Sequence, residues 1–167
     1  MTKFRADVGV LMNITPDHLD RYDYKFENYA ASKMRITQNQ SSADAFIYSA
    51  DDDMTRQMLD KMDSSLRARQ LPFAINTAIA SGDGDAVLEG YTFTASVGKQ
   101  SVTIDTRKMQ IHGMHNIYNA MAAALATLAA GVEPRVIKRS IYDFSPVEHR
   151  LEPAGERNGI RWINDSK

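Results

Sequence analysis

Several short groups of polar residues in this sequence are of types that handle cations, phosphates or nucleosides. The first contains Thr15, Asp17 and His18, which place a hydroxyl, a carboxylate and an imidazole within four residues. Such a set suits Mg²⁺ or phosphate, although His is an unusual ligand for Mg²⁺. The plainer interpretation is a helix N-terminus that Thr15 or Asp17 caps, with His18 incidental. The residue types alone leave both interpretations open.

Lys33 shares a predicted helical face with Tyr29 and Ile36, because residues three or four apart lie on one side of a helix. Burial of a lysine on an apolar face favours the neutral amine, which is the form that reacts. The alternative is a snorkelling lysine, whose stem is buried while its ammonium group stays in water.

Acidic and amide residues form two further groups. The three acids at 51–53 could bind a cation, or they could complement the positive end of a helix. Asn116 and Asn119 lie three residues apart at the start of an Ala-rich stretch, so their amides can point the same way and contact a purine edge. The alternative is that Asn116 caps the helix.

The last third of the chain offers groups that suit phosphate and ribose. Arg150, in the charged run 148–152, could clamp a phosphate, or it could belong to a surface ion-pair network. Asp165 and Lys167 follow a strand-like run and could hold a ribose or a phosphate, or they could simply be solvated. The sequence contains neither G-x-x-x-x-G-K-[ST] nor G-x-G-x-x-G, so it has no phosphate-cradling loop of its own.

Alternating strands and helices must position the first of these groups. Short apolar runs at 6–13, 45–50 and 72–76 are typical of parallel strands buried on both faces. Between them, the pattern predicts helices over 26–38 and 51–67. His18 therefore follows the carboxyl end of a predicted parallel strand, which is the edge where open α/β sheets bind ligands.

Antiparallel patterning follows. The runs 86–95 and 101–111 predict two antiparallel strands around a turn at Gly98 and Lys99. The predicted class is therefore α/β, a mostly parallel sheet flanked by helices with a small antiparallel β insertion.

The C-terminal third is predicted to hold two helices and a hairpin. One helix covers 114–130 and ends at Gly131, and a second covers 134–144. The range 150–167 is predicted as strand–turn–strand, with the turn at Asn158 and Gly159.

Composition excludes several classes of protein. A hydrophobic content of 43% over 167 residues argues for one folded domain rather than a disordered chain. A net charge of −1 argues against nucleic acid or an anionic membrane as partner. The absence of Cys excludes disulfides, thiolate metal sites and cysteine nucleophiles. The sequence shows no membrane-spanning run and no signal peptide, so we expect a cytoplasmic location.

In order and spacing, five segments resemble the Mur ligase family, and the resemblance covers nearly the whole chain. The segments are residues 13–22 (NITPDHLDRY), 30–36 (AASKMRI), 115–119 (HNIYN), 149–152 (HRLE) and 162–167 (WINDSK). The NDSK ending resembles the member that joins D-glutamate to UDP-N-acetylmuramoyl-L-alanine. The alternatives are a folylpolyglutamate synthase-like ligase and a stand-alone nucleotide-binding module without catalysis.

The resemblance implies an amide ligase that uses ATP and two Mg²⁺ ions. The substrate carboxylate attacks the γ-phosphate of ATP, which releases ADP, and the amine of D-glutamate then displaces phosphate from the acyl phosphate. Family members have three domains. We therefore expect residues 1–167 to form a single, truncated central domain, with the UDP-binding part, the phosphate loop and the amino-acid-binding domain outside it. On this expectation the chain alone is inactive.

Site roles also follow from the resemblance. It implies that His18 binds the second Mg²⁺, that Lys33 reacts with CO₂ to form a carbamate ligand, and that Asp17 supports the metal. It implies that Asn116 and Asn119 contact adenine.

The remaining roles lie near the end of the chain. The resemblance implies that Arg150 contacts the phosphates of ATP, that Asp165 holds the ribose, and that Lys167 lies near the phosphates. Because neighbouring strands would be missing, we also expect an exposed sheet edge through which the chain self-associates.

Overall fold

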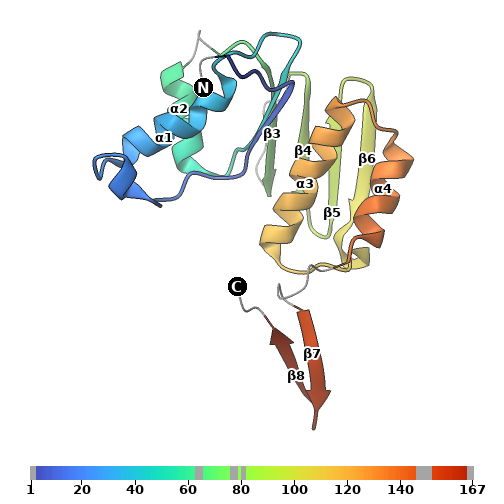
Figure 1. Cartoon of the computed structure of the whole chain (residues 1–167). Coiled ribbons are helices and arrows are strands. Elements are labelled where there is room, and N and C mark those ends of the chain that lie inside the picture. Colours follow the sequence, from blue (N-terminus) through green and yellow to red (C-terminus); the bar gives the residue numbers. More distant parts are fainter. Residues whose placement is uncertain (1–2, 63–65, 76–78, 80–81, 146–151, 165–167) are drawn as a thin grey trace.

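The computed structural model describes residues 3–62, 66–75, 79, 82–145 and 152–164. Within them, one sheet has the strand order β1-β2-β3-β4-β5-β6 (Figure 1). Neighbours from β1 to β4 pair in parallel, whereas β4–β5 and β5–β6 pair antiparallel. This confirms the predicted class. The strands are β1 (Val8–Leu11), β2 (Ala45–Ser49), β3 (Arg69–Ile75), β4 (Gly84–Glu89), β5 (Thr92–Val97) and β6 (Gln100–Asp105).

Helices cover both faces of the sheet. α3 crosses the face toward which Ile47 points, and α4 packs beside it over β6 (Figure 1). α1 and α2 pack on the opposite face, where Phe46 points, because successive strand residues alternate between faces. The helices are α1 (Phe26–Met34), α2 (Asp53–Met62), α3 (Met114–Ala129) and α4 (Pro134–Asp143), with short 3₁₀ turns η1 (Leu19–Arg21), η2 (Arg35–Thr37) and η4 (Thr106–Lys108).

The larger core lies between the sheet and α3. Phe73, Phe93 and Ile104 from the strands and Met121 and Leu125 from α3 are all fully buried. In β5 and β6, the residues that alternate with core residues are mainly exposed threonines and serines. The antiparallel part of the sheet therefore has one solvated face, as antiparallel sheets tolerate.

Two predicted elements differ from the structure. The run 86–95 is not one strand, because Gly90 and Tyr91 form a two-residue loop between β4 and β5. Gly90 takes a φ of +59°, a conformation that glycine adopts without steric cost. The strand predicted over 101–111 ends at Asp105, whose carboxylate accepts the Arg107 N–H and starts η4.

The predicted turns at 98–99 and 158–159 are confirmed, and so is the predicted cap at Gly131. The loop of Gly98 and Lys99 joins β5 to β6. Gly131 ends α3 with a φ of +82°, and its N–H donates to the Leu128 carbonyl at 2.9 Å. Asn158 and Gly159, with φ of +53° and +75°, join the last two strands.

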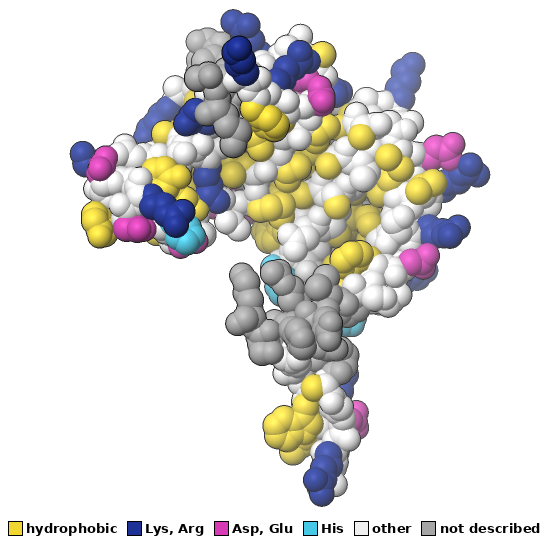
Figure 2. Space-filling model, in the orientation of Figure 1, with side chains coloured by type: hydrophobic (Ala, Val, Ile, Leu, Met, Phe, Trp, Pro, Cys, Tyr) yellow, Lys and Arg dark blue, Asp and Glu magenta, His cyan; other side chains and the backbone are white. Residues whose placement is uncertain are grey.

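The last two strands, β7 (Glu152–Arg157) and β8 (Ile160–Asn164), form a separate antiparallel hairpin. Figure 1 shows this hairpin extending away from the main sheet, and Figure 2 shows apolar side chains on its surface. Ile160, Trp162 and Ile163 are each about 60% exposed. Nowhere in the described residues is a helix long and apolar enough to cross a membrane.

Candidate functional site

A polar pocket of about 260 Å³ lies at the carboxyl edge of β1 and β2, beside the first turns of α3. Ligands of open α/β sheets bind in the crevice outside the carboxyl ends of the strands. The pocket lies beyond the carboxyl ends of two predicted parallel strands, and of the candidate residues singled out above it is lined by Asp51, Asp52 and Asn119. Its lining consists of Met12, Asn13, Ser49, Asp51, Asp52, His115, Tyr118 and Asn119.

Asp52 forms one wall of the pocket and fixes the start of α2. Its Oδ2 accepts the Thr55 N–H at 2.8 Å and the Thr55 hydroxyl at 2.6 Å, which is the geometry of an N-cap. The same oxygen accepts the Ile14 N–H at 3.2 Å, so the cap also holds the chain that leaves β1. Asp53 instead pairs with Arg56 at the surface. Asp52 and Asp53 therefore act at the start of helix α2, as the second of the two sequence interpretations expected.

Asp51 and Tyr118 meet across the pocket. The Tyr118 hydroxyl donates to Asp51 Oδ2 at 2.7 Å. Burial raises the pKa of the Tyr118 hydroxyl to about 12, and the Asp51 carboxylate adds to this shift. The phenol therefore keeps its proton at neutral pH and acts as a donor.

The amides of Asn116 and Asn119 occupy different positions. Asn119 lines the pocket together with His115. Asn116 Nδ2 donates to the His112 carbonyl at 2.8 Å, a bond within the turn that begins α3. The structure therefore brings Asn119 to the pocket and engages Asn116 in the helix start. Their shared contact with adenine remains a prediction.

An apolar groove of about 290 Å³ adjoins the pocket between α3 and α4. Asn119 lines both, and it is one of the few polar residues in the groove. The groove is lined mainly by aliphatic side chains, among them Val132, Val136 and Ile137, so it does not suit phosphate.

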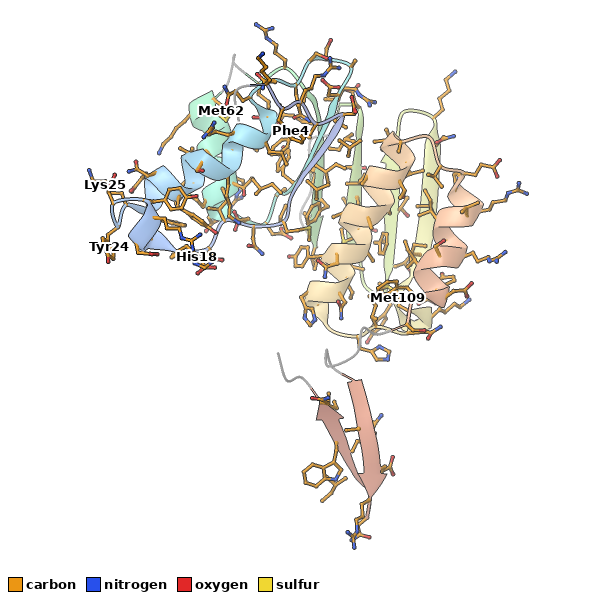
Figure 3. The ribbon with its side chains drawn as sticks, viewed as in Figure 1. Phe4, His18, Tyr24, Lys25, Met62 and Met109 are labelled. Carbon is orange, nitrogen blue, oxygen red and sulfur yellow. The ribbon has the colours of Figure 1, made fainter. Side chains whose placement is uncertain are left out.

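His18 lies on an exposed loop before α1 (Figure 3). The side chain of its neighbour Asp17 is also exposed and contacts it. His18 Nε2 is 3.4 Å from Asp17 Oδ2, and the His18 N–H donates to Asp17 Oδ1 at 2.9 Å. His18 has a left-handed backbone, with a φ of +48°. Neither side chain lines the pocket.

Lys33 lies on α1 over an aromatic cluster. Its Nζ is 5.2 Å from the centre of the Tyr29 ring, which packs against the rings of Tyr22 and Phe26. The side chain is half-buried, and within the described residues it forms no ion pair. This agrees with the predicted apolar face, and it fits both the snorkelling and the chemical interpretation.

Three predicted site residues, Arg150, Asp165 and Lys167, lie outside the described residues. In the part of the chain that is described, no three His, Asp or Glu side chains are grouped to hold a metal ion.

Tyr118 and Ser49 line the pocket but were not predicted as site residues from the sequence. A signal for Tyr118 was present, because it lies three residues after His115 and one before Asn119, on the same side of α3. Ser49 carried no such signal, since a serine at the end of a strand is common.

Residues 1–127 match the Mur ligase middle domain. The chain belongs to the Mur ligase family. A UDP-N-acetylmuramoylalanine--D-glutamate ligase from Christiangramia forsetii is 42% identical over 165 residues, which cover 99% of this chain and 36% of that protein. The chain thus spans about a third of the length of the curated relatives it matches.

Solved Mur ligases share the fold. MurF from Acinetobacter baumannii superposes with a TM-score of 0.70 at 20% identity, over 97% of this chain and 34% of that one. MurF from Thermotoga maritima in complex with ADP has a TM-score of 0.59 at 19% identity, over 97% of this chain and 36% of that one. At these identities the likeness shows the fold alone.

Proposed function

We propose that this chain is the ATP-binding central part of a cytoplasmic ligase that adds D-glutamate to UDP-N-acetylmuramoyl-L-alanine during peptidoglycan precursor synthesis. The observation that carries the proposal is the sequence identity to a relative named UDP-N-acetylmuramoylalanine--D-glutamate ligase, which is 42% over 99% of the chain. The polar pocket at the carboxyl edge of the sheet supports it, because it offers amide, carboxylate and hydroxyl groups to a nucleotide.

In this proposal α3 contacts the nucleoside. Asn119 lines the pocket, and the Asn116 amide, whose Nδ2 donates to the His112 carbonyl, keeps its oxygen as an acceptor for the nucleoside. Arg150 and Lys167 contact the phosphates, and Asp165 contacts the ribose. ATP, when bound, supplies the γ-phosphoryl group that activates the substrate carboxylate for attack by the D-glutamate amine.

The residues proposed for Mg²⁺ supply only some of the ligands that the ion needs. Asp17 and His18 offer an oxygen and a nitrogen side by side in solvent. Protein Mg²⁺ sites commonly use one or two carboxylates and leave the other positions to water and substrate phosphates. A carbamate on Lys33 would form when its neutral amine adds to CO₂ and releases a proton, and it would supply a second carboxylate-like group.

The test is an assay of the complete protein encoded by the reading frame that contains these 167 residues. Phosphate release should require ATP, UDP-N-acetylmuramoyl-L-alanine and D-glutamate together, and L-glutamate should not replace D-glutamate. Activity with a folate acceptor and none with D-glutamate would overturn the proposal. The 167-residue chain alone should show no D-glutamate-dependent turnover, and turnover by it would refute the assignment of a central part.

We also propose that the chain self-associates through β1. Within the described residues β1 pairs only with β2, so its outer edge has no strand partner, whereas α4 packs over the β6 side. Val10 on β1 is 37% exposed, and an apolar edge strand invites pairing with another chain. Light scattering of the 167-residue chain should show dimers that V10K reduces. A monomer at high concentration would refute this proposal.

A further inference from the structure

One carboxylate oxygen joins three parts of the chain at the pocket. Asp51 Oδ2 accepts the Tyr118 hydroxyl at 2.7 Å and the Ile75 N–H at 2.7 Å. Asp51 follows β2, Ile75 ends β3, and Tyr118 lies in the second turn of α3. The bond between Tyr118 and Asp51 therefore ties the start of α3 to the carboxyl edge of the sheet.

The surroundings of the bond make it stronger than a surface contact. The Tyr118 ring is half-buried and packs 5.9 Å from the fully buried ring of Phe73. A neutral phenol that donates to a charged carboxylate forms a bond about twice as strong as one between neutral groups. Because the pKa of Tyr118 is raised to about 12, this donor persists across the physiological pH range.

Besides this bond, the first turns of α3 are held by the packing of the Ile117 and Tyr118 side chains against the core. The helix begins after Gly113, which provides no side-chain cap, and Met114 and His115 are exposed. Buried residues of α3 begin at Ala120. Among the described residues, the Tyr118 hydroxyl makes the side-chain hydrogen bond that connects residues 114–119 to the sheet edge.

We propose that Tyr118 is a positioning residue for the nucleotide, which acts by holding His115 and Asn119 against the pocket through its bond to Asp51. His115, Tyr118 and Asn119 share one helical face, and all three line the pocket. A tilt of this turn would therefore displace the other two side chains together. The inference rests on the proposed function, because it assigns the pocket to the nucleotide.

The first test is Y118F in the complete protein, since Phe keeps the ring against Phe73 and removes only the hydroxyl. The matched control is Y142F. The Tyr142 hydroxyl also makes one hydrogen bond, from the Asp105 N–H at 3.0 Å, but Tyr142 lies on α4 away from the pocket. Y118F should raise the KM for ATP about tenfold and leave kcat and the KM for D-glutamate within about twofold. Y142F should leave all three within about twofold.

Equal KM values for ATP in the two variants would overturn the inference, while an active wild type would leave the proposed function standing. A loss of kcat without a change in KM for ATP would also overturn it. If the wild type shows no ATP-dependent turnover, the proposed function fails, and so does the nucleotide role of Tyr118.

The structural part has its own test in the 167-residue chain. Amide hydrogen exchange over residues 114–119 should be faster in Y118F than in Y142F, because only Y118F releases the start of α3. Equal exchange in the two variants would show that the bond to Asp51 does not hold this turn.

Discussion

The carboxylate of Asp52 is expected to stabilise the fold far more than its neighbour Asp53, although both acids lie at the start of α2. Asp52 Oδ2 accepts the N–H and the hydroxyl of Thr55 and the N–H of Ile14. Thr55 and Ile14 are buried, so water cannot readily replace the lost acceptor in D52A.

The expected cost of D52A can be worked from these contacts. Loss of an N-cap acceptor costs about 1 kcal/mol. Leaving the buried Thr55 hydroxyl and Ile14 N–H without this partner adds about 1 kcal/mol or more for each group. We therefore expect the free energy of unfolding to fall by about 3 kcal/mol, which corresponds to a fall in Tm of about 10 °C for a chain of this size.

The measurement is urea unfolding of the 167-residue chain, followed by circular dichroism. D53A is the matched control, because it removes the same charge from the same helix terminus but breaks only the exposed pair with Arg56. It should cost no more than about 0.5 kcal/mol. D52N keeps an acceptor oxygen and should fall between the two. Equal losses in D52A and D53A would mean that helix-terminal charge, and not the three bonds, stabilises this corner.

Three further results are expected. K33R in the complete protein should lower ligase activity about 10–100-fold with little change in Tm, because a guanidinium cannot form a carbamate. Arg107 holds the pKa of Asp105 at about 2, below its ordinary 3.8, so Asp105 stabilises the fold above pH 4 and loses this contribution as the pH falls toward 2. D105N should therefore flatten the dependence of unfolding free energy on pH in that window, as acid titration with circular dichroism can show. G84A should lower the free energy of unfolding by about 3 kcal/mol, because its Cβ would lie 2.1 Å from a backbone oxygen of β5. G82A meets no atom within 4 Å and should change it by less than about 0.5 kcal/mol in the same urea experiment.

Each of these expectations can fail on its own. Full activity in K33R would exclude a carbamate at that position. An unchanged acid transition in D105N would mean that the bond between Asp105 and Arg107 contributes nothing to folding. Similar unfolding free energies for G84A and G82A would show that β4 and β5 separate enough to admit a methyl group.

Local sequence was sufficient for most elements of the fold. Gly131, the turn of Asn158 and Gly159, and the loop of Gly98 and Lys99 were predictable because glycine and asparagine adopt conformations that other residues avoid. The apolar strand runs were predictable because parallel strands are buried on both faces. The end of β4 and the start of β5 were not predicted, because the alternation of apolar and polar residues continues across the two-residue loop at Gly90. The sequence pattern alone therefore does not mark the turn.

The sequence by itself determined which residue types are available for chemistry and the order in which they occur. The tertiary structure decided which of them meet. Asp51 and Tyr118 are 67 residues apart, and no local pattern pairs them. Their contact exists because α3 crosses the sheet and brings its first turns to the carboxyl ends of β2 and β3. In the same way, the sequence does not distinguish Asn116 from Asn119, which lie three residues apart on one predicted helix. In the packed structure Asn119 lines the pocket, whereas Asn116 donates to the His112 carbonyl. Local propensity acts over a few residues, whereas a site at a sheet edge depends on contacts between distant segments that form only when the core packs.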